Sequence, residues 1–268
     1  MTAERIDRTF ARLREQGRPA LVAFLVVGDP SVEESLACAR AALEAGADAL
    51  ELGVPFSDPT ADGPVIAAAG QRAIARGGSL RAALTVAREL RKTSDAPLVL
   101  FSYYNPIVMF GEAALPRAAA EAGADGLLVV DLPPEEGALL RAGARDAELA
   151  IVPLLTPTTG PERERKIYAG ARGFLYYVSV TGITGTTRAP LADAGRDAAA
   201  LAKRAGLPVI VGFGVRTPDD ARTLARAGVD GIAVGTEIVR AIASASDTAG
   251  RVRAVSELVS GLRAALDG

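Results

Sequence analysis

The sequence predicts an α/β protein, a single (β/α)₈ TIM barrel over residues 1–268 with an extra N-terminal helix. Three observations favour this fold: short apolar runs alternate with longer helical patterns, the runs suffice for eight βα units, and 268 residues is a usual barrel size. A doubly wound open sheet is the alternative, although it usually has fewer strands for this length. No linker or second domain interrupts the pattern.

The expected strands are short runs rich in apolar residues, several of them continuous, as in parallel strands that are buried on both faces. They are 21–27, 49–52, 98–101, 126–130, 151–155, 174–178, 209–211 and 231–234.

Helical patterns lie between these runs, and each begins at or near a residue suited to a helix start. The clearest are Ser31–Ala45, Ser79–Arg91, Glu112–Ala122, Glu135–Ala147 and Thr217–Ala227. Three related segments, 45–48, 122–125 and 227–230, each read Ala-Gly-(Ala/Val)-Asp and join a helix to a strand. Their glycines suit a left-handed helix cap. Before the first strand, Ile6, Phe10 and Leu13 predict a helix that covers the bottom of the barrel.

Composition excludes several classes of protein. A net charge of −2 gives no basic field for nucleic acid or anionic lipid, and the longest apolar run, 20–27, is too short to span a bilayer. The N-terminus has no apolar stretch typical of a signal peptide, and the lone Cys38 excludes an intrachain disulfide. We therefore expect a cytoplasmic protein. It has no histidine, so carboxylates, tyrosines or water must carry any proton transfer.

The most informative segment is 50–64, LELGVPFSDPTADGP. Side chains alternate along a barrel strand, so if Leu50 and Leu52 face the helices, Glu51 points into the barrel near its C-terminal mouth, where such folds have their active sites. Burial there raises the pKa of a carboxyl, which suits a group that gives and takes a proton near neutral pH. A proline-rich loop then holds Asp62 at a fixed distance from Glu51, which predicts a pair of catalytic carboxylates.

Glycine clusters follow the last two strands. Gly212 and Gly214 flank Phe213, and Gly235-Thr236 opens a helix, which is the usual phosphate site of this fold. Ordinary βα turns are the alternative reading. A third glycine-rich segment, 181–188, is long and polar, and we interpret it as a lid over a small phosphorylated substrate. None of the three lysines follows a strand, which disfavours a lysine imine or a pyridoxal enzyme.

These motifs together resemble the α subunit of tryptophan synthase, from the first strand to the last helix. Segment 50–64 is similar to that family's signature; further similarities are 24–30 (FLVVGDP), 104–106 (YNP), 131–133 (DLP), the 182–185 segment and 212–214 (GFG). The resemblance implies retro-aldol cleavage of indole-3-glycerol phosphate to indole and glyceraldehyde 3-phosphate in tryptophan biosynthesis. It also implies a β-subunit partner in an α₂β₂ heterotetramer, and no cofactor or metal.

The resemblance also implies a role for individual residues. Glu51 would protonate the indole C3 and remove the proton of the glycerol hydroxyl, while Asp62 would accept a hydrogen bond from the indole N–H. The residues implied in substrate binding are Phe24, Tyr103, Leu128, Val130, Tyr176 and Thr184, and those implied in phosphate binding are Gly185, Gly214, Gly235 and Thr236. For the apolar ones, plain barrel core is the other reading.

Two residues depart from the family pattern: Thr60 replaces a larger apolar residue in the loop that resembles the β-facing loop, and Ala67 replaces a frequent glutamine. Neither change touches the carboxylate pair. The sequence leaves open a stand-alone lyase that supplies free indole, a non-catalytic subunit that activates its β partner, and a sugar-phosphate isomerase of the same route. The Glu51–Asp62 pair argues against the non-catalytic reading.

Overall fold

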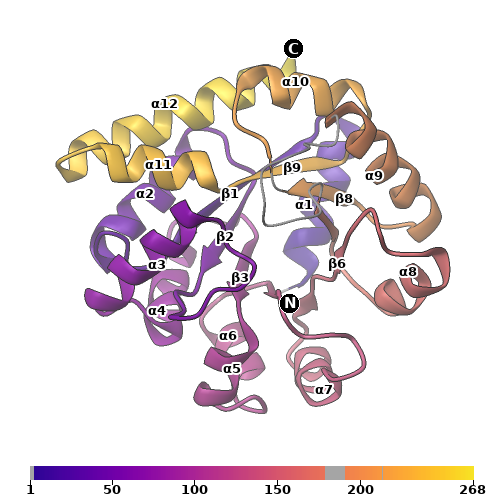
Figure 1. Cartoon of the computed structure of the whole chain (residues 1–268), viewed down its shortest axis with the longest axis horizontal. Coiled ribbons are helices and arrows are strands. Elements are labelled where there is room, and N and C mark those ends of the chain that lie inside the picture. Colours follow the sequence, from indigo (N-terminus) through magenta and orange to yellow (C-terminus); the bar gives the residue numbers. More distant parts are fainter. Residues whose placement is uncertain (1–2, 179–190, 213) are drawn as a thin grey trace.

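Parallel strands and helices alternate along the chain in the computed structural model, which describes residues 3–178, 191–212 and 214–268 (Figure 1). Every strand pairing is parallel. The strands are β1 Ala20–Val26, β2 Ala49–Gly53, β3 Leu98–Ser102, β4 Gly126–Val129, β5 Ala150–Ile151, β6 Leu154–Leu155, β7 Leu175–Val178, β8 Val209–Gly212 and β9 Gly231–Val234.

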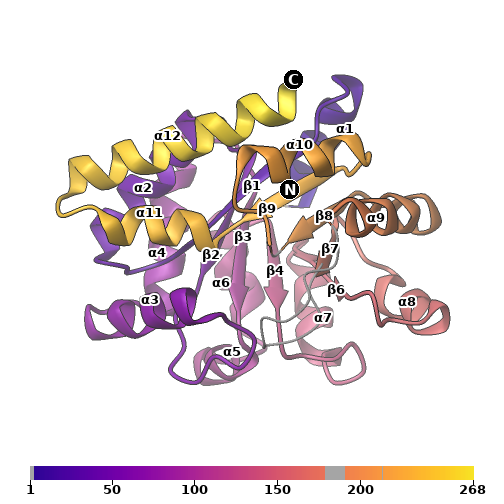
Figure 2. The same ribbon diagram turned by 45° about the horizontal axis from the view of Figure 1, so that its top comes forward.

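All the helices except the first surround the strands on the outside of the sheet, as Figures 1 and 2 show. The helices are α1 Ala3–Glu15, α2 Val32–Glu44, α3 Pro64–Ala75, α4 Leu80–Arg91, α5 Tyr104–Phe110, α6 Leu115–Glu121, α7 Ala138–Asp146, α8 Pro161–Tyr168, α9 Leu191–Ala205, α10 Pro218–Arg226, α11 Thr236–Ser244 and α12 Thr248–Asp267.

The sheet curls into a barrel that the chain itself closes. Its order is β5-β4-β3-β2-β1-β9-β8-β7-β6, and only Val152 and Pro153 separate β5 from β6 along the chain. The N–H of Val152 donates to Leu127 of β4, whereas the carbonyl of Pro153 accepts from Tyr176 of β7. The segment 150–155 is therefore one barrel strand in two halves, each paired with a different neighbour. This confirms the predicted α/β barrel.

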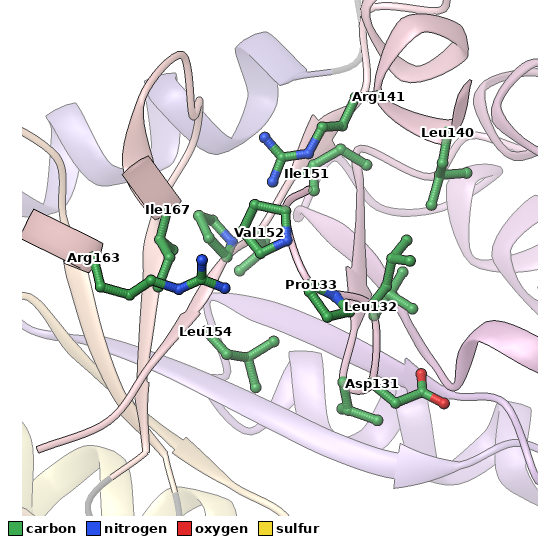
Figure 3. Close-up of a pocket in the computed structure, with 14 residues that line it drawn as sticks. Asp131, Leu132, Pro133, Leu140, Arg141, Ile151, Val152, Leu154, Arg163 and Ile167 are labelled. Atoms are coloured by element: carbon green, nitrogen blue, oxygen red, sulfur yellow. The ribbon is translucent and has the colours of Figure 1, made fainter. Parts of the chain in front are cut away.

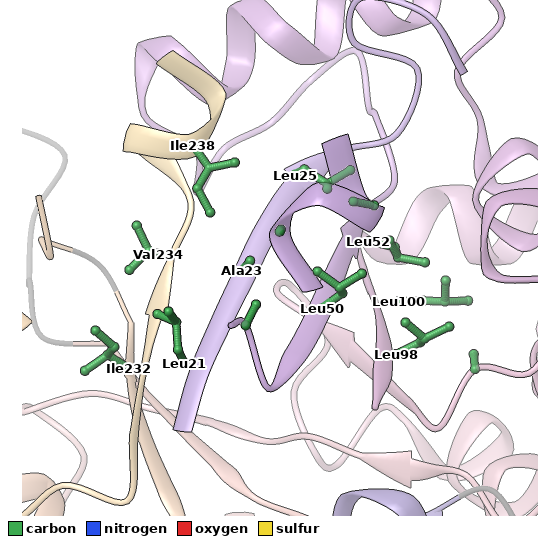
Figure 4. Close-up of a cluster of buried hydrophobic side chains, with 14 of the residues drawn as sticks. Leu21, Ala23, Leu25, Leu50, Leu52, Leu98, Leu100, Ile232, Val234 and Ile238 are labelled. Carbon is green, nitrogen blue, oxygen red and sulfur yellow. The ribbon is translucent and has the colours of Figure 1, made fainter. Parts of the chain in front are cut away.

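Alternation along the strands separates two apolar layers. Leu21, Ala23 and Leu25 of β1 pack outwards with Leu50 and Leu52 of β2, beneath the helices (Figure 4). The intervening residues of the same strands, such as Val22, Phe24 and Val26, belong to a second cluster inside the barrel. The predicted division between helix layer and lumen is confirmed.

Helix α1 closes the N-terminal end of the barrel, as predicted. Its buried face includes Ile6, Phe10 and Leu13. The ring of Phe10 lies 5.6 Å from that of Phe174, just before β7, and Ile6 packs where a side chain on Gly173 would clash. The bottom of the barrel is thus filled by side chains.

The three repeated Ala-Gly-(Ala/Val)-Asp segments lie at this end, and their glycines have positive φ values of 108°, 86° and 81°, as a left-handed cap requires. Each aspartate then accepts a hydrogen bond from the first part of an adjacent strand. Asp48 binds the N–H of Leu21, Asp125 that of Leu98, and Asp230 that of Val209.

Three predicted helix starts are confirmed and two are wrong. The side chains of Ser31, Ser79 and Thr217 cap α2, α4 and α10. Helix α6, however, begins at Leu115 and α7 at Ala138, three residues after Glu112 and Glu135. Glu112 instead accepts a hydrogen bond from Leu140 of α7, and Glu135 forms an ion pair with Arg163 of α8. Both glutamates serve tertiary contacts, which local sequence patterns do not reveal. No helix in the described ranges is long and apolar enough to cross a bilayer.

Candidate active site

Glu51 is buried inside the barrel at the centre of β2. It pairs in register with Phe24 of β1 and Val99 of β3, both members of the inner cluster, and its exposed fraction is 0%. Neither carboxylate oxygen has a hydrogen-bond partner among the described residues. Burial in this apolar setting raises the pKa of Glu51 to about 8. The group is therefore largely protonated at neutral pH and can donate a proton.

Asp62 lies in the loop between β2 and α3, where the hydroxyl of Tyr103 holds it. Burial raises the pKa of Asp62 to about 6, and the hydrogen bond from Tyr103 opposes that rise. The same hydroxyl accepts from the N–H of Ala61 at 2.9 Å, and the rings of Tyr103 and Phe56 lie 5.2 Å apart. Burial, followed by the charge of Asp62, raises the pKa of Tyr103 to about 12, so the phenol remains a donor. At neutral pH Asp62 is mainly ionised, unlike Glu51.

Both carboxyl groups face one cavity of about 220 Å³ at the C-terminal mouth of the barrel. Its walls combine aromatic side chains, the two acids and the glycine-rich loops. They are formed by Phe24, Glu51, Asp62, Ile66, Phe101, Tyr176, Gly214, Val215, Arg216, Ala233, Gly235 and Thr236. Seven of these are residues that the sequence singled out: Glu51, Asp62, Phe24, Tyr176, Gly214, Gly235 and Thr236. The cavity therefore combines apolar ring surfaces with a small number of polar groups, as ligand pockets usually do.

The aromatic rings of the cavity are placed by neighbouring glycines. Phe24 and Phe101 meet edge to face with centroids 5.1 Å apart. A Cβ atom on Gly235 would lie 2.9 Å from the Phe24 ring, and one on Gly212 would lie 2.0 Å from the Tyr176 hydroxyl oxygen. Burial and then the charge of Glu51 raise the pKa of Tyr176 well above its ordinary value. These glycines therefore have a packing role that the sequence did not indicate.

The far loops of the cavity have the geometry of an anion site. Gly214 has a φ of 91°, which other residues rarely adopt, and helix α11 begins at Thr236 without a side-chain cap on its N-terminus. The first N–H groups of a helix have no partner within it, and they carry a partial positive charge. They are available here to a phosphate group.

Three residues predicted to bind the substrate lie outside the walls of this cavity. Tyr103 lines a small adjoining space, where its hydroxyl donates a hydrogen bond to Asp62. Leu128 is buried in the inner cluster, and Val130 lines a separate cavity of about 310 Å³. Figure 3 shows that second cavity, with Arg141 and Arg163 among its lining side chains. Thr184, Gly185 and the rest of the predicted lid lie outside the described residues.

Sequence reasoning missed Ile66, Phe101, Ala233 and Arg216. Phe101 and Ala233 could have been found from alternation, because each lies on the lumen side of its strand at the C-terminal end. Ile66 comes from α3, a helix that the sequence analysis did not predict. Arg216 lies two residues after Gly214, a spacing without a recognised signal.

Comparison with known proteins agrees with this geometry. A family model described as "Tryptophan synthase alpha chain" matches residues 10–267. A tryptophan synthase alpha chain from Desulfosudis oleivorans is 48% identical over 238 residues, which are 89% of either chain.

Solved structures lead to the same family. The crystal structure of tryptophan synthase subunit alpha from Legionella pneumophila is similar with a TM-score of 0.88 and 35% identity, over 98% of both chains. A structure of Mycobacterium tuberculosis tryptophan synthase is similar with a TM-score of 0.88 and 31% identity, also over 98% of both chains. The chain described here therefore belongs to the tryptophan synthase alpha chain family.

Proposed function

We propose that this protein is a lyase, the α subunit of tryptophan synthase, which cleaves indole-3-glycerol phosphate to indole and glyceraldehyde 3-phosphate in tryptophan biosynthesis. One observation carries the proposal most directly: Glu51 and Asp62, two buried acids whose pKa values are raised to about 8 and about 6, line one cavity with aromatic rings and glycine-rich loops.

The reaction requires two proton transfers, and Glu51 performs both. Its carboxyl gives a proton to C3 of the indole, which turns the ring into a cationic indolenine. The resulting carboxylate then removes the proton of the glycerol hydroxyl next to the ring. As the carbonyl of the aldehyde forms, the carbon–carbon bond breaks and its electron pair returns to the ring. Indole leaves, and Glu51 is again protonated. A pKa of about 8 matches a group that must act in both directions.

Asp62 stabilises the cationic ring by accepting a hydrogen bond from the indole N–H. A fixed anion at the point where positive charge develops lowers the energy of the transition state. Its pKa of about 6 keeps Asp62 ionised at neutral pH while Glu51 stays protonated. The different environments of the two acids thus separate their roles.

The remaining walls bind the ends of the substrate. Phe24, Phe101 and Tyr176 offer an apolar slot for the indole ring. The N–H groups at Gly214 and at Gly235-Thr236 bind the phosphate. Holding both ends positions the reacting carbon between the two carboxyl groups.

The proposal includes a β-subunit partner in an α₂β₂ heterotetramer. Of the four large hydrophobic side chains exposed in the described ranges, three lie on α5 and α7: Val108, Met109 and Leu139. Helix α5 follows β3 directly, α7 follows β4 after the loop 130–137, and Glu112 just after α5 accepts a hydrogen bond from Leu140. An exposed apolar surface beside the mouth suits a partner that receives the indole. The proposal also takes the chain as one barrel domain that acts in the cytoplasm.

Indole release from indole-3-glycerol phosphate by the purified chain tests this proposal. We expect slow release that rises strongly when a tryptophan synthase β subunit is added. Glu51→Gln should lower turnover by about a thousandfold, because an amide cannot relay a proton. The control Glu121→Gln makes the same chemical change on the exposed face of α6 and should keep full turnover.

Each contrary outcome has a clear meaning. Unchanged turnover in Glu51→Gln would remove Glu51 from the reaction. Rapid release that ignores the β subunit would identify a stand-alone lyase. No release under either condition would contradict the proposed reaction and favour a non-catalytic subunit.

A further inference from the structure

Arg216 lines the same cavity as Glu51 and Asp62, at the end of the cavity formed by the glycine loops. It is the sole basic residue among the described residues that line this cavity. A phosphorylated substrate brings a dianion into a space that already contains the ionised carboxylate of Asp62. Repulsion between them opposes binding unless a positive charge lies nearby.

The backbone at Arg216 is held in place. Its N–H donates to the carboxylate of Asp220 at 2.9 Å, and the N–H of Thr217 donates to the same oxygen at 3.1 Å. Thr217 and Asp220 form a capping box at the start of α10, and Val215 is buried. The side chain of Arg216 is therefore attached to a fixed position in the cavity wall, two residues after Gly214.

Arg216 forms no ion pair with another residue in the described ranges, 3–178, 191–212 and 214–268. The acidic groups next to it are engaged otherwise: Asp219 binds Arg222, and Asp220 caps the helix. Arg216 is exposed, so its guanidinium is accessible to solvent and to a ligand.

We propose that Arg216 is a specificity-determining residue that binds the phosphate group of the substrate and favours phosphorylated over unphosphorylated ligands. Its guanidinium adds a full charge and a forked pair of donors to a site that is otherwise built from backbone N–H groups and the α11 N-terminus. The inference rests on the proposed function, because it assigns this residue to the phosphate end of that substrate.

Direct binding of glycerol 3-phosphate and of indole, measured by calorimetry, tests the inference together with steady-state kinetics. Arg216→Ala should weaken glycerol 3-phosphate binding and raise KM by about tenfold, as expected for one exposed charge-assisted contact. Indole binding should stay the same, and kcat should change less than KM. The affinity and KM of Arg216→Lys should lie between those of the natural chain and those of Arg216→Ala, because lysine keeps the charge but lacks the forked pair of donors.

Arg222→Ala is the matched control. It removes the same charge six residues away, from a side chain paired with Asp219, and should leave both affinities unchanged. The affinity of the natural chain for glycerol 3-phosphate should also fall with added salt more steeply than that of Arg216→Ala.

The inference is overturned if Arg216→Ala binds glycerol 3-phosphate as tightly as the natural chain, or if Arg222→Ala weakens it equally. A wrong proposed function would give a different result from a wrong assignment of Arg216. In that case the natural chain would release no indole, whereas the calorimetric comparison of the variants would still report on Arg216.

Discussion

At the scale of single residues, Glu51 is favourable for catalysis and unfavourable for folding. Its pKa is raised from 4.5 to about 8 by burial alone. Between these values the unfolded chain has released the proton while the folded chain retains it. The contribution of the protonated Glu51 to the free energy of unfolding is therefore fully present below pH 4.5, and it is lost as the pH rises to about 8. A buried acid without a hydrogen-bond partner in the described structure weakens the fold most in the pH range where the enzyme works.

We expect Glu51→Gln to be more stable than the natural protein, and increasingly so between pH 5 and pH 8. The difference should grow by up to roughly 1.4 kcal/mol per pH unit, because glutamine has no proton to lose. Thermal unfolding of both proteins across this range measures the effect. Glu121→Gln should show no such trend, and parallel curves for Glu51→Gln would mean that Glu51 ionises normally in the folded state.

Tyr103 controls the second acid, so Tyr103→Phe should raise the pKa of Asp62 above about 6. The acid side of the kcat/KM profile should shift to higher pH, and turnover near neutrality should fall about tenfold, the value of one charged hydrogen bond. Tyr177→Phe is the control, since its hydroxyl lies 3.4 Å from Asp197 in the outer layer. An unmoved acid limb in Tyr103→Phe would show that this phenol does not act on Asp62.

The sequence could predict the direction of Glu51 but not the role of Tyr103. Alternation on a strand is local, and it places Glu51 opposite Leu50 and Leu52 without knowledge of the rest of the fold. The contact between Tyr103 and Asp62 joins two segments about forty residues apart and depends on how the proline-rich loop folds back over β3. Arg216 was missed because its spacing after Gly214 has no recognised signal, and the cavity that it lines forms only in the folded chain.

At the scale of elements, the aspartates before β2, β4 and β9 are the most regular feature of the barrel bottom. Asp125 is fully buried and binds Arg91 at 2.7 Å and Arg5 at 2.8 Å besides the N–H of Leu98. Burial nevertheless raises its pKa. The arginines therefore compensate only part of the desolvation, and the group holds two strands together rather than adding a strong net ion pair.

Replacing these aspartates should destabilise the protein in the order of their burial. Asp125→Ala leaves Arg91 and a buried N–H without a partner and should cost about 3 kcal/mol. Asp230→Ala should cost about 1 kcal/mol, because its side chain is 23% exposed and its arginine, Arg14, lies 3.6 Å away. Denaturant unfolding measures both variants. Equal losses would mean that the strand N–H, which both aspartates bind, dominates over the arginines.

The sequence predicted the strands better than the helices. Runs such as 231–234 and 98–101 have strong apolar signals and short turns on either side, and the structure places strands there. Helices α3 and α5 were not predicted: α5 has only seven residues, and α3 packs against β1 and α11. Their formation depends on contacts with the barrel more than on a pattern of their own.

At the scale of the whole molecule, counting βα units was enough to predict a barrel, because eight such units in about 250 residues are the usual make-up of this fold. The count could not show the split of one strand into β5 and β6. Pro153 has no N–H to give to a ladder, so regular pairing stops there while the chain continues.

The apolar surface of α5 and α7 gives a prediction about assembly. Met109 is 78% exposed, and Met109→Asp should weaken the activation of indole release by a β subunit at least tenfold while leaving the slow basal release unchanged. Ile74→Asp is the control, because Ile74 is also exposed but lies on α3, which packs against α11 on another side of the barrel. Titration of each variant with the β subunit would measure the difference. Equal activation of both would place the docking surface elsewhere.

The division of one barrel strand into β5 and β6 has a consequence for how the molecule opens and aggregates. A closed sheet has no free edges, but here closure depends on ladders of two residues on either side of Pro153. If this segment separates, the ring becomes an open sheet whose two edges, at β4 and β7, carry unpaired backbone groups. Exposed edges of this kind template pairing with other chains. Aggregation of a partly opened molecule should therefore begin at the place where the barrel is closed.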